Sequence, residues 1–90
     1  MALDLVNALA DLREEETLKI VQDRLSAGDA PLNILDDARR GLEMVGARFA
    51  KGEYFIPDLL YSGEILKGIT AIVKPEMSKG PADNALFSDN

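Results

Sequence analysis

The sequence contains neither cysteine nor histidine among its 90 residues. Without cysteine there are no disulfides and no thiolate metal sites, which is compatible with a reducing compartment. Without histidine the chain lacks the most common general base, the most common metal ligand and the side chain that titrates near neutral pH. Catalytic triads and zinc sites are therefore not expected.

Long apolar runs are missing as well. No segment reaches the roughly 18 consecutive apolar residues that indicate a transmembrane helix. Met1 is not followed by the basic segment and apolar core of a secretion signal. We therefore expect a cytoplasmic protein with no membrane partner. Because 47% of its residues are hydrophobic, the chain should fold, and 90 residues correspond to one small domain.

The charge balance is acidic, with 10 basic and 16 acidic residues and a net charge of -6. A nucleic-acid partner is not expected, because binding one favours a basic patch and the basic residues here are scattered. Glu14, Glu15 and Glu16 lie where a helix would begin, and the helix dipole favours acidic residues there. Asp36 and Asp37 are adjacent, so they point in different directions on a helix and make a poor acid–base pair. We expect the chain to be non-catalytic by itself.

Apolar residues recur at helical spacing along the chain, which predicts four helices. The first helix is expected over residues 4–10. The second should follow Asp11, which lies three residues before Glu14 as in a capping box, and should stop at Gly28.

The third helix is expected to begin near residue 30, with Pro31 in its first turn, and to end at Gly52. Its apolar face comprises Leu35, Ala38, Leu42, Val45 and Phe49. The fourth should begin at Pro57 and stop at Pro75. The predicted fold is all-α, an antiparallel four-helix bundle over residues 1–75. Residues 76–90, rich in Gly, Pro, Ser and Asn, are predicted to form a flexible linker or tail.

Four glycines lie inside the predicted helices: Gly41, Gly46, Gly63 and Gly68. Each costs about 1 kcal/mol relative to alanine, so the cost should be offset elsewhere. Close packing between helices is the favoured explanation. The other is close approach by a flat ligand or a second domain.

The reversal between the third and fourth helices, "ARFAKGEYFIPDLL" (residues 47–60), is unusually apolar for a turn. It contains Phe49, Tyr54, Phe55 and Ile56. These side chains either close the end of the bundle core or face a partner. Aromatic residues at helical spacing are mostly core, which favours the first interpretation when the residues are considered alone.

The same region carries a longer pattern: V-G-x-x-F, a short charged stretch with glycine, F-[LI]-P, then serine and a small residue. The matching positions are Val45, Gly46, Phe49, Gly52, Phe55, Ile56, Pro57, Ser62 and Gly63. In this pattern the chain resembles the helical cap domain of corrinoid-binding methyl carriers, which include the methyltransferase cognate corrinoid proteins and part of cobalamin-dependent methionine synthase. The resemblance covers about residues 4–75.

The resemblance implies a cap over the upper, methyl-bearing face of a cobalamin cofactor. Residues matching Phe49, Ile56 and Leu59 would contact that face, whereas Phe55 would be core. The apolar contact would shield the methyl–cobalt bond from water and photolysis. The implied partners are a Rossmann-like cobalamin domain, a substrate-specific methyltransferase and a methyl-acceptor methyltransferase.

Two features depart from the family. After Ser62 the sequence reads "GEIL", where the family more often has alanine and then methionine. The family's Asp-x-His-x-x-Gly motif, which supplies the lower cobalt ligand, is absent. We therefore expect the cofactor-holding domain to be missing from this chain. The alternative is a freestanding interaction module that forms a homo-oligomer through its exposed apolar face.

Overall fold

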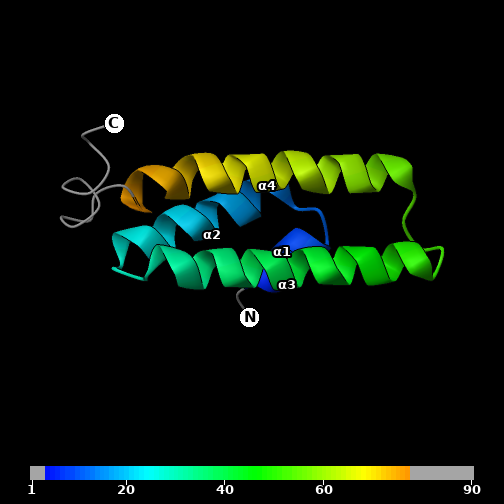
Figure 1. The fold of residues 1–90 in the computed structure, drawn as a ribbon, viewed down its shortest axis with the longest axis horizontal. Helices are drawn as coiled ribbons and strands as arrows, with labels where there is room; N and C mark the ends of the chain where they lie inside the picture. Colours follow the sequence, from blue (N-terminus) through cyan, green and yellow to red (C-terminus); the bar gives the residue numbers. More distant parts are fainter. Residues whose placement is uncertain (1–3, 78–90) are drawn as a thin grey trace, which may run out of the picture.

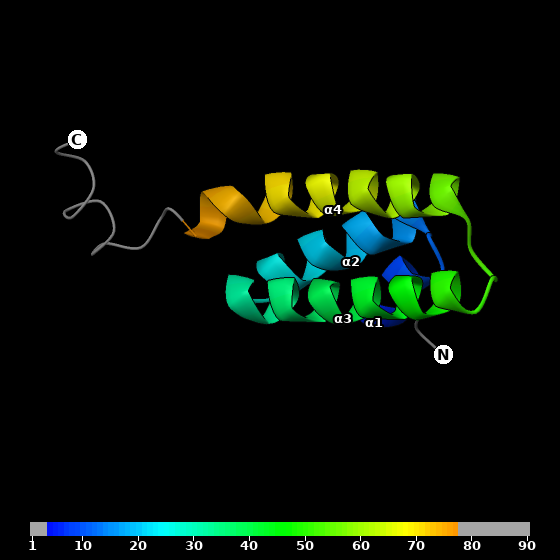
Figure 2. The ribbon, with the colours of Figure 1, turned by 45° about the vertical axis from the view of Figure 1, so that its right-hand side comes forward.

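The computed structural model describes residues 4–77, which form four helices: α1 (Leu5–Ala10), α2 (Glu14–Ser26), α3 (Pro31–Ala50) and α4 (Ile56–Met77). The long helices α3 and α4 run antiparallel, and α2 lies between them along half their length (Figures 1 and 2). The short α1 packs mainly on α3. The predicted antiparallel helical bundle is confirmed. None of the helices in this part of the chain is long and apolar enough to cross a bilayer.

All four helices contribute to one apolar core. The fully buried members are Leu5, Leu9, Val21, Ile34, Ala38, Ile65, Ile69 and Val73. The core face of α3 includes Ala38 and Val45, as predicted, but at its start Ile34 is buried and Leu35 is only half-buried, and Phe49 at its end is exposed. Buried Thr17 and Ser62 donate their hydroxyl hydrogens to backbone carbonyls, at 2.6 and 2.7 Å, so neither lacks a partner.

Three helices end in the same way. After α1, α2 and α3, two backbone N–H groups beyond the helix bond back to its last turn, as in a Schellman motif. The residue with left-handed backbone is Gly28 after α2 and Gly52 after α3, which confirms both predicted stops. After α1 it is Leu12, with φ of 60°. A leucine is strained there, and its side chain packs against the core.

Two predicted helix boundaries are wrong. Asp11 does not begin α2 but follows the last residue of α1, because the Schellman turn occupies residues 11–13. The helix α2 begins at Glu14, after Arg13, without a side-chain cap. At the other end of the chain, α4 passes through Pro75 and ends at Met77. Pro75 removes one backbone donor from α4, but the helix continues for two residues beyond it. The tail was predicted over residues 76–90. Residues 76 and 77 belong to α4, and residues 78–90 lie outside the described part of the chain.

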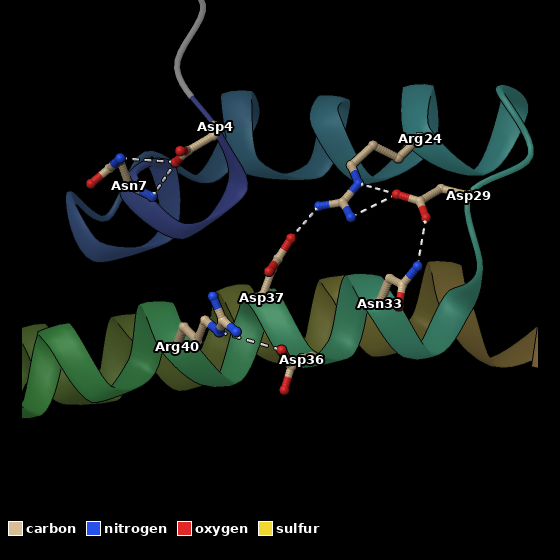
Figure 3. A network of polar contacts seen from close by, with 8 residues as sticks. All are labelled: Asp4, Asn7, Arg24, Asp29, Asn33, Asp36, Asp37 and Arg40. Atoms are coloured by element: carbon tan, nitrogen blue, oxygen red, sulfur yellow. Dashed lines mark hydrogen bonds and ion pairs between the residues drawn. The ribbon is translucent and has the colours of Figure 1, made fainter.

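An arginine joins α2, the following turn and α3. Arg24 donates to Asp29 through Nε at 2.7 Å and to Asp37 through Nη1 at 2.7 Å (Figure 3). Asn33 donates to the second oxygen of Asp29 at 3.1 Å. Burial lowers the pKa of Arg24, but the bonds to Asp37 and Asp29 outweigh it and raise that pKa. The bonds from Asn33 and Arg24 hold the pKa of Asp29 below its usual value.

The four helical glycines fall into two pairs. A Cβ at Gly41 would lie 3.0 Å from the Cβ of fully buried Leu9, and one at Gly68 would lie 3.0 Å from Cδ2 of Leu18. A Cβ at Gly46 or Gly63 would meet nothing within 4 Å. Helix packing therefore explains Gly41 and Gly68, as predicted, but it does not explain Gly46 and Gly63.

Alanine substitutions should separate these pairs. Gly41→Ala should lower the free energy of unfolding by up to about 2 kcal/mol, because the clash with Leu9 exceeds the gain in helix propensity. Gly68→Ala should be nearly neutral, since the far end of the Leu18 side chain can move. Gly46→Ala and Gly63→Ala should each raise it by about 0.5–1 kcal/mol. Urea unfolding of the four variants measures this, and equal losses in all four would contradict the assignment.

The Arg24 cluster should make stability depend on pH. The lowered pKa of Asp29 means that its contribution is present above the ordinary aspartate pKa and is lost as pH falls through the folded-state value. Asp29→Asn should therefore be less stable than the unsubstituted chain at pH 7, with the gap closing in acid. The control is Asp23→Asn, whose ion pair with Lys19 is exposed. A gap that does not change with pH would contradict this role for Asp29.

Candidate ligand-binding surface

Exposed apolar side chains concentrate where α3 turns into α4. Of seven large hydrophobic residues exposed in the described part of the chain, five fall within residues 49–61. They are Phe49 (40% exposed), Phe55 (66%), Ile56 (57%), Leu60 (68%) and Tyr61 (40%). We call the first four of these residues the reversal surface. This concentration makes the reversal the candidate contact site, because scattered single residues would need no explanation.

The predicted contact residues have different environments. Phe49 and Ile56 are exposed, as a contact role requires, whereas Leu59, also in the first turns of α4, is half-buried. The prediction that Phe55 is core is wrong. Its side chain is 66% exposed, because the reversal runs outside the end of the bundle. Contact between these side chains and a cofactor stays a prediction.

Polar groups hold the reversal from its inner side. Nη1 of Arg48 donates to the Ala10 carbonyl and to Asp11 Oδ1, both at 2.8 Å, and to the Tyr54 hydroxyl at 3.0 Å. The Tyr54 hydroxyl donates to the same Ala10 carbonyl at 2.6 Å. The guanidinium also lies 5.6 Å from the centre of the Tyr54 ring. The hydrogen bond to Asp11 raises the pKa of Arg48 the most, and the hydrogen bond to Tyr54 raises it further.

The start of α4 is held by its own first turn. The Asp58 carboxylate accepts a hydrogen bond of 2.9 Å from the Phe55 backbone N–H. This satisfies one of the donors that a helix beginning leaves open, and the negative charge is favoured there. Pro57 adds a backbone already restricted to helical φ. The exposed side chains of Phe55 and Ile56 therefore project from a well-defined backbone.

Tyr61 lies on the side of α4 that faces α2. Its hydroxyl donates to Oε1 of Glu14 at 3.4 Å. Burial raises the pKa of Tyr61 above its usual value, and the charge of Glu14 raises it further. This residue therefore contributes to the α2–α4 contact as well as to the exposed area.

Sequence reasoning missed Leu60, Arg48 and the hydrogen bonds of Tyr54, which it had named only as one of the aromatic residues of the reversal. Leu60 had a usable signal, since it lies four residues after Ile56 and thus on the same face of α4. Arg48 and Tyr54 had none, because they bond to Ala10 from 38 and 44 positions away along the chain. Only the fold brings the end of α1 next to the end of α3.

The chemistry of this surface is limited. In residues 4–77 no group of three or more acidic, histidine or cysteine side chains could hold a metal ion. The reversal surface itself presents only hydrocarbon and aromatic rings. An arrangement of this kind can cover a flat apolar object and exclude water from it, but it offers no base, acid or nucleophile of its own.

Sequence comparison identifies the family. Residues 2–74 match the family described as the B12 binding domain, and the chain belongs to that family. It is 30% identical over 74 residues to trimethylamine corrinoid protein 2 of Methanosarcina mazei. It is also 30% identical over 76 residues to monomethylamine corrinoid protein 1 of the same organism, and 32% over 80 residues to a corrinoid protein of Desulfitobacterium hafniense.

These alignments cover 81–84% of this chain but only 34–36% of each relative. The chain thus spans about a third of the length of the relatives it matches. No solved structure matches. The resemblance to the cap domain of methyltransferase corrinoid proteins is confirmed by the family match and by these relatives.

The exposure of the reversal surface predicts small stability costs. Phe55→Ala should change the free energy of unfolding by no more than about 0.5 kcal/mol, as for an ordinary surface substitution. Phe49→Ala should cost clearly less than the roughly 3–5 kcal/mol of a buried phenylalanine. The control is Ile65→Ala, fully buried in α4, which should cost about 2–5 kcal/mol. A loss from Phe49→Ala as large as the control's would show that its ring belongs to the core.

Proposed function

We propose that this chain is the cap over the upper face of a corrinoid cofactor in a methyl-transfer system. The observation that carries the proposal is the reversal surface, which is apolar, exposed and presented by a backbone fixed at both ends. The family match and the corrinoid relatives support it. When bound, the corrinoid supplies the chemistry, since its cobalt carries the methyl group between donor and acceptor.

The residues present fit such a cofactor face. Phe49 and Ile56 are the proposed contacts, with Leu59 beside them and Phe55 and Leu60 widening the covered area. Their role is to exclude water and lower the local dielectric around a reactive centre. The surface offers no side chain that ionises near neutral pH, so it cannot deliver a proton there.

The cofactor itself is proposed to be held by a different domain. This chain has no histidine, so it cannot offer an imidazole as lower ligand to cobalt. A Rossmann-like cobalamin domain, beyond residues 1–75 or on another chain, is the proposed holder. The further partners are a substrate-specific methyltransferase and a methyl-acceptor methyltransferase. Since several relatives are named for trimethylamine and monomethylamine, methylated amines are the first donors to test.

A hybrid protein tests the shielding role. Residues 2–74 of this chain replace the matching segment of trimethylamine corrinoid protein 2 of M. mazei, and the hybrid is loaded with methylcobalamin. Under anaerobic illumination, Phe49→Ala and Ile56→Ala should each speed loss of the methyl–cobalt absorption spectrum, and the double variant more. The control is Leu32→Ala, because Leu32 is 67% exposed but lies about 25 Å from Phe49 along α3.

Equal photolysis rates in all these hybrids would reject the shielding role. The rival function, self-association through the same surface, predicts a different result. Sedimentation of the 90-residue chain at micromolar concentration would then show a saturable dimer that Ile56→Ala weakens. A monomer throughout that range favours the cap.

A further inference from the structure

The side chains of the α3–α4 reversal face outward with one exception. Among residues 51–57, only Tyr54 is partly buried. Lys51, Glu53, Phe55 and Ile56 are all exposed, so no apolar side chain of this segment anchors it to the core. Within this segment, Tyr54 therefore provides the side-chain contact with the bundle, through its partly buried ring and its hydrogen-bonded hydroxyl.

Tyr54 and Arg48 supply those bonds to a different part of the fold. Both side chains donate to the carbonyl of Ala10, at 2.6 and 2.8 Å. That residue is the last of α1, where carbonyl groups lack helical partners. Arg48 also accepts, through its backbone carbonyl, the N–H groups of Glu53 at 2.9 Å and Tyr54 at 3.3 Å. One arginine thus holds the reversal through both its side chain and its backbone.

We propose that Arg48 and Tyr54 are positioning residues, which set Ile56 and Phe55 relative to Phe49 by tying the α3–α4 reversal to the end of α1. Phe49 is already fixed as part of α3. Ile56 is the first residue of α4 and lies before Ser62, the first buried residue of that helix, so its place also depends on the path of residues 51–55. The proposal rests on the proposed function for its purpose, since a rigid macrocycle needs contacts at a fixed spacing. The hydrogen bonds from Arg48 and Tyr54 to Ala10, which we call the tie, are tested without any cofactor.

The test uses Tyr54→Phe in the full 90-residue chain. This change keeps the ring and removes the hydroxyl that bonds to Ala10 and Arg48. Amide hydrogen exchange at Glu53 and at position 54 is compared with exchange at Ile65 and Ile69 in the core of α4. We expect the reversal amides to speed up about fivefold or more relative to the core amides. The order parameter of the Ile56 Cδ1 methyl group should fall at the same time.

Tyr61→Phe is the matched control. It removes a tyrosine hydroxyl that also bonds to another helix, at 3.4 Å to Glu14, rather than to Ala10 or Arg48. Its ratio of reversal to core exchange should match that of the unsubstituted chain. Arg48→Met is a second variant in case Tyr54→Phe does not fold. It keeps an unbranched side chain but removes the donor that reaches Ala10, Asp11 and Tyr54, so the same ratio should rise.

If the Tyr54 hydroxyl contributes only to the overall stability of the fold, a different result is expected. If Tyr54→Phe speeds exchange by the same factor at reversal and core amides, and Ile56 stays ordered, the tie only adds global stability and the proposal is overturned. In the methylcobalamin hybrid, Tyr54→Phe should also speed photolysis while Tyr61→Phe does not. If the unsubstituted hybrid gives no protection at all, the cap function fails, whereas the exchange ratio still decides the positioning role.

Discussion

The close contact between Leu9 and Gly41 is the constraint on which the rest of this structure depends. The helix α1 has only six residues, too few to be stable without packing. Leu9 lies directly on the backbone of α3, where a Cβ at Gly41 would come within 3.0 Å of it. That contact places the end of α1 against the middle of α3, where the Arg48 side chain reaches it. The Ala10 carbonyl then becomes available to Arg48 and Tyr54, and the reversal has something to bind.

Two arginines perform related tasks at opposite ends of α3. Arg24 joins α2 and the turn after it to Asp37 in the first half of α3, while Arg48 joins the last turn of α3 to the end of α1. Both are partly shielded from solvent, at 26% and 27% side-chain exposure. The planar fork of Arg24 reaches two carboxylates through Nε and Nη1, whereas Arg48 reaches Ala10, Asp11 and Tyr54 through Nη1 alone. Turns with little apolar burial of their own are thereby held in one geometry.

The distribution of hydrophobic residues separates the core of this small domain from a group of exposed apolar side chains at the reversal. The core residues lie in the middle of the bundle, whereas the reversal carries exposed rings and aliphatic groups that add little to folding. Gly46 and Gly63 fit the same division. They lower helix stability without relieving any contact within the fold. A chain selected for stability alone would have alanine at both positions and polar residues at the reversal.

The sequence by itself determined the class of fold, because helical periodicity, Gly28, Gly52, Pro31 and Pro57 act locally, whereas Pro75 did not stop α4. It also carried the family pattern around Phe49 and Ile56. The tertiary structure decided which of these side chains are exposed. Phe55 looked like core because aromatic residues usually are, but the path of the reversal leaves it outside. The Arg48–Tyr54–Ala10 tie and the strained Leu12 depend on contacts between distant segments, so no local pattern could reveal them.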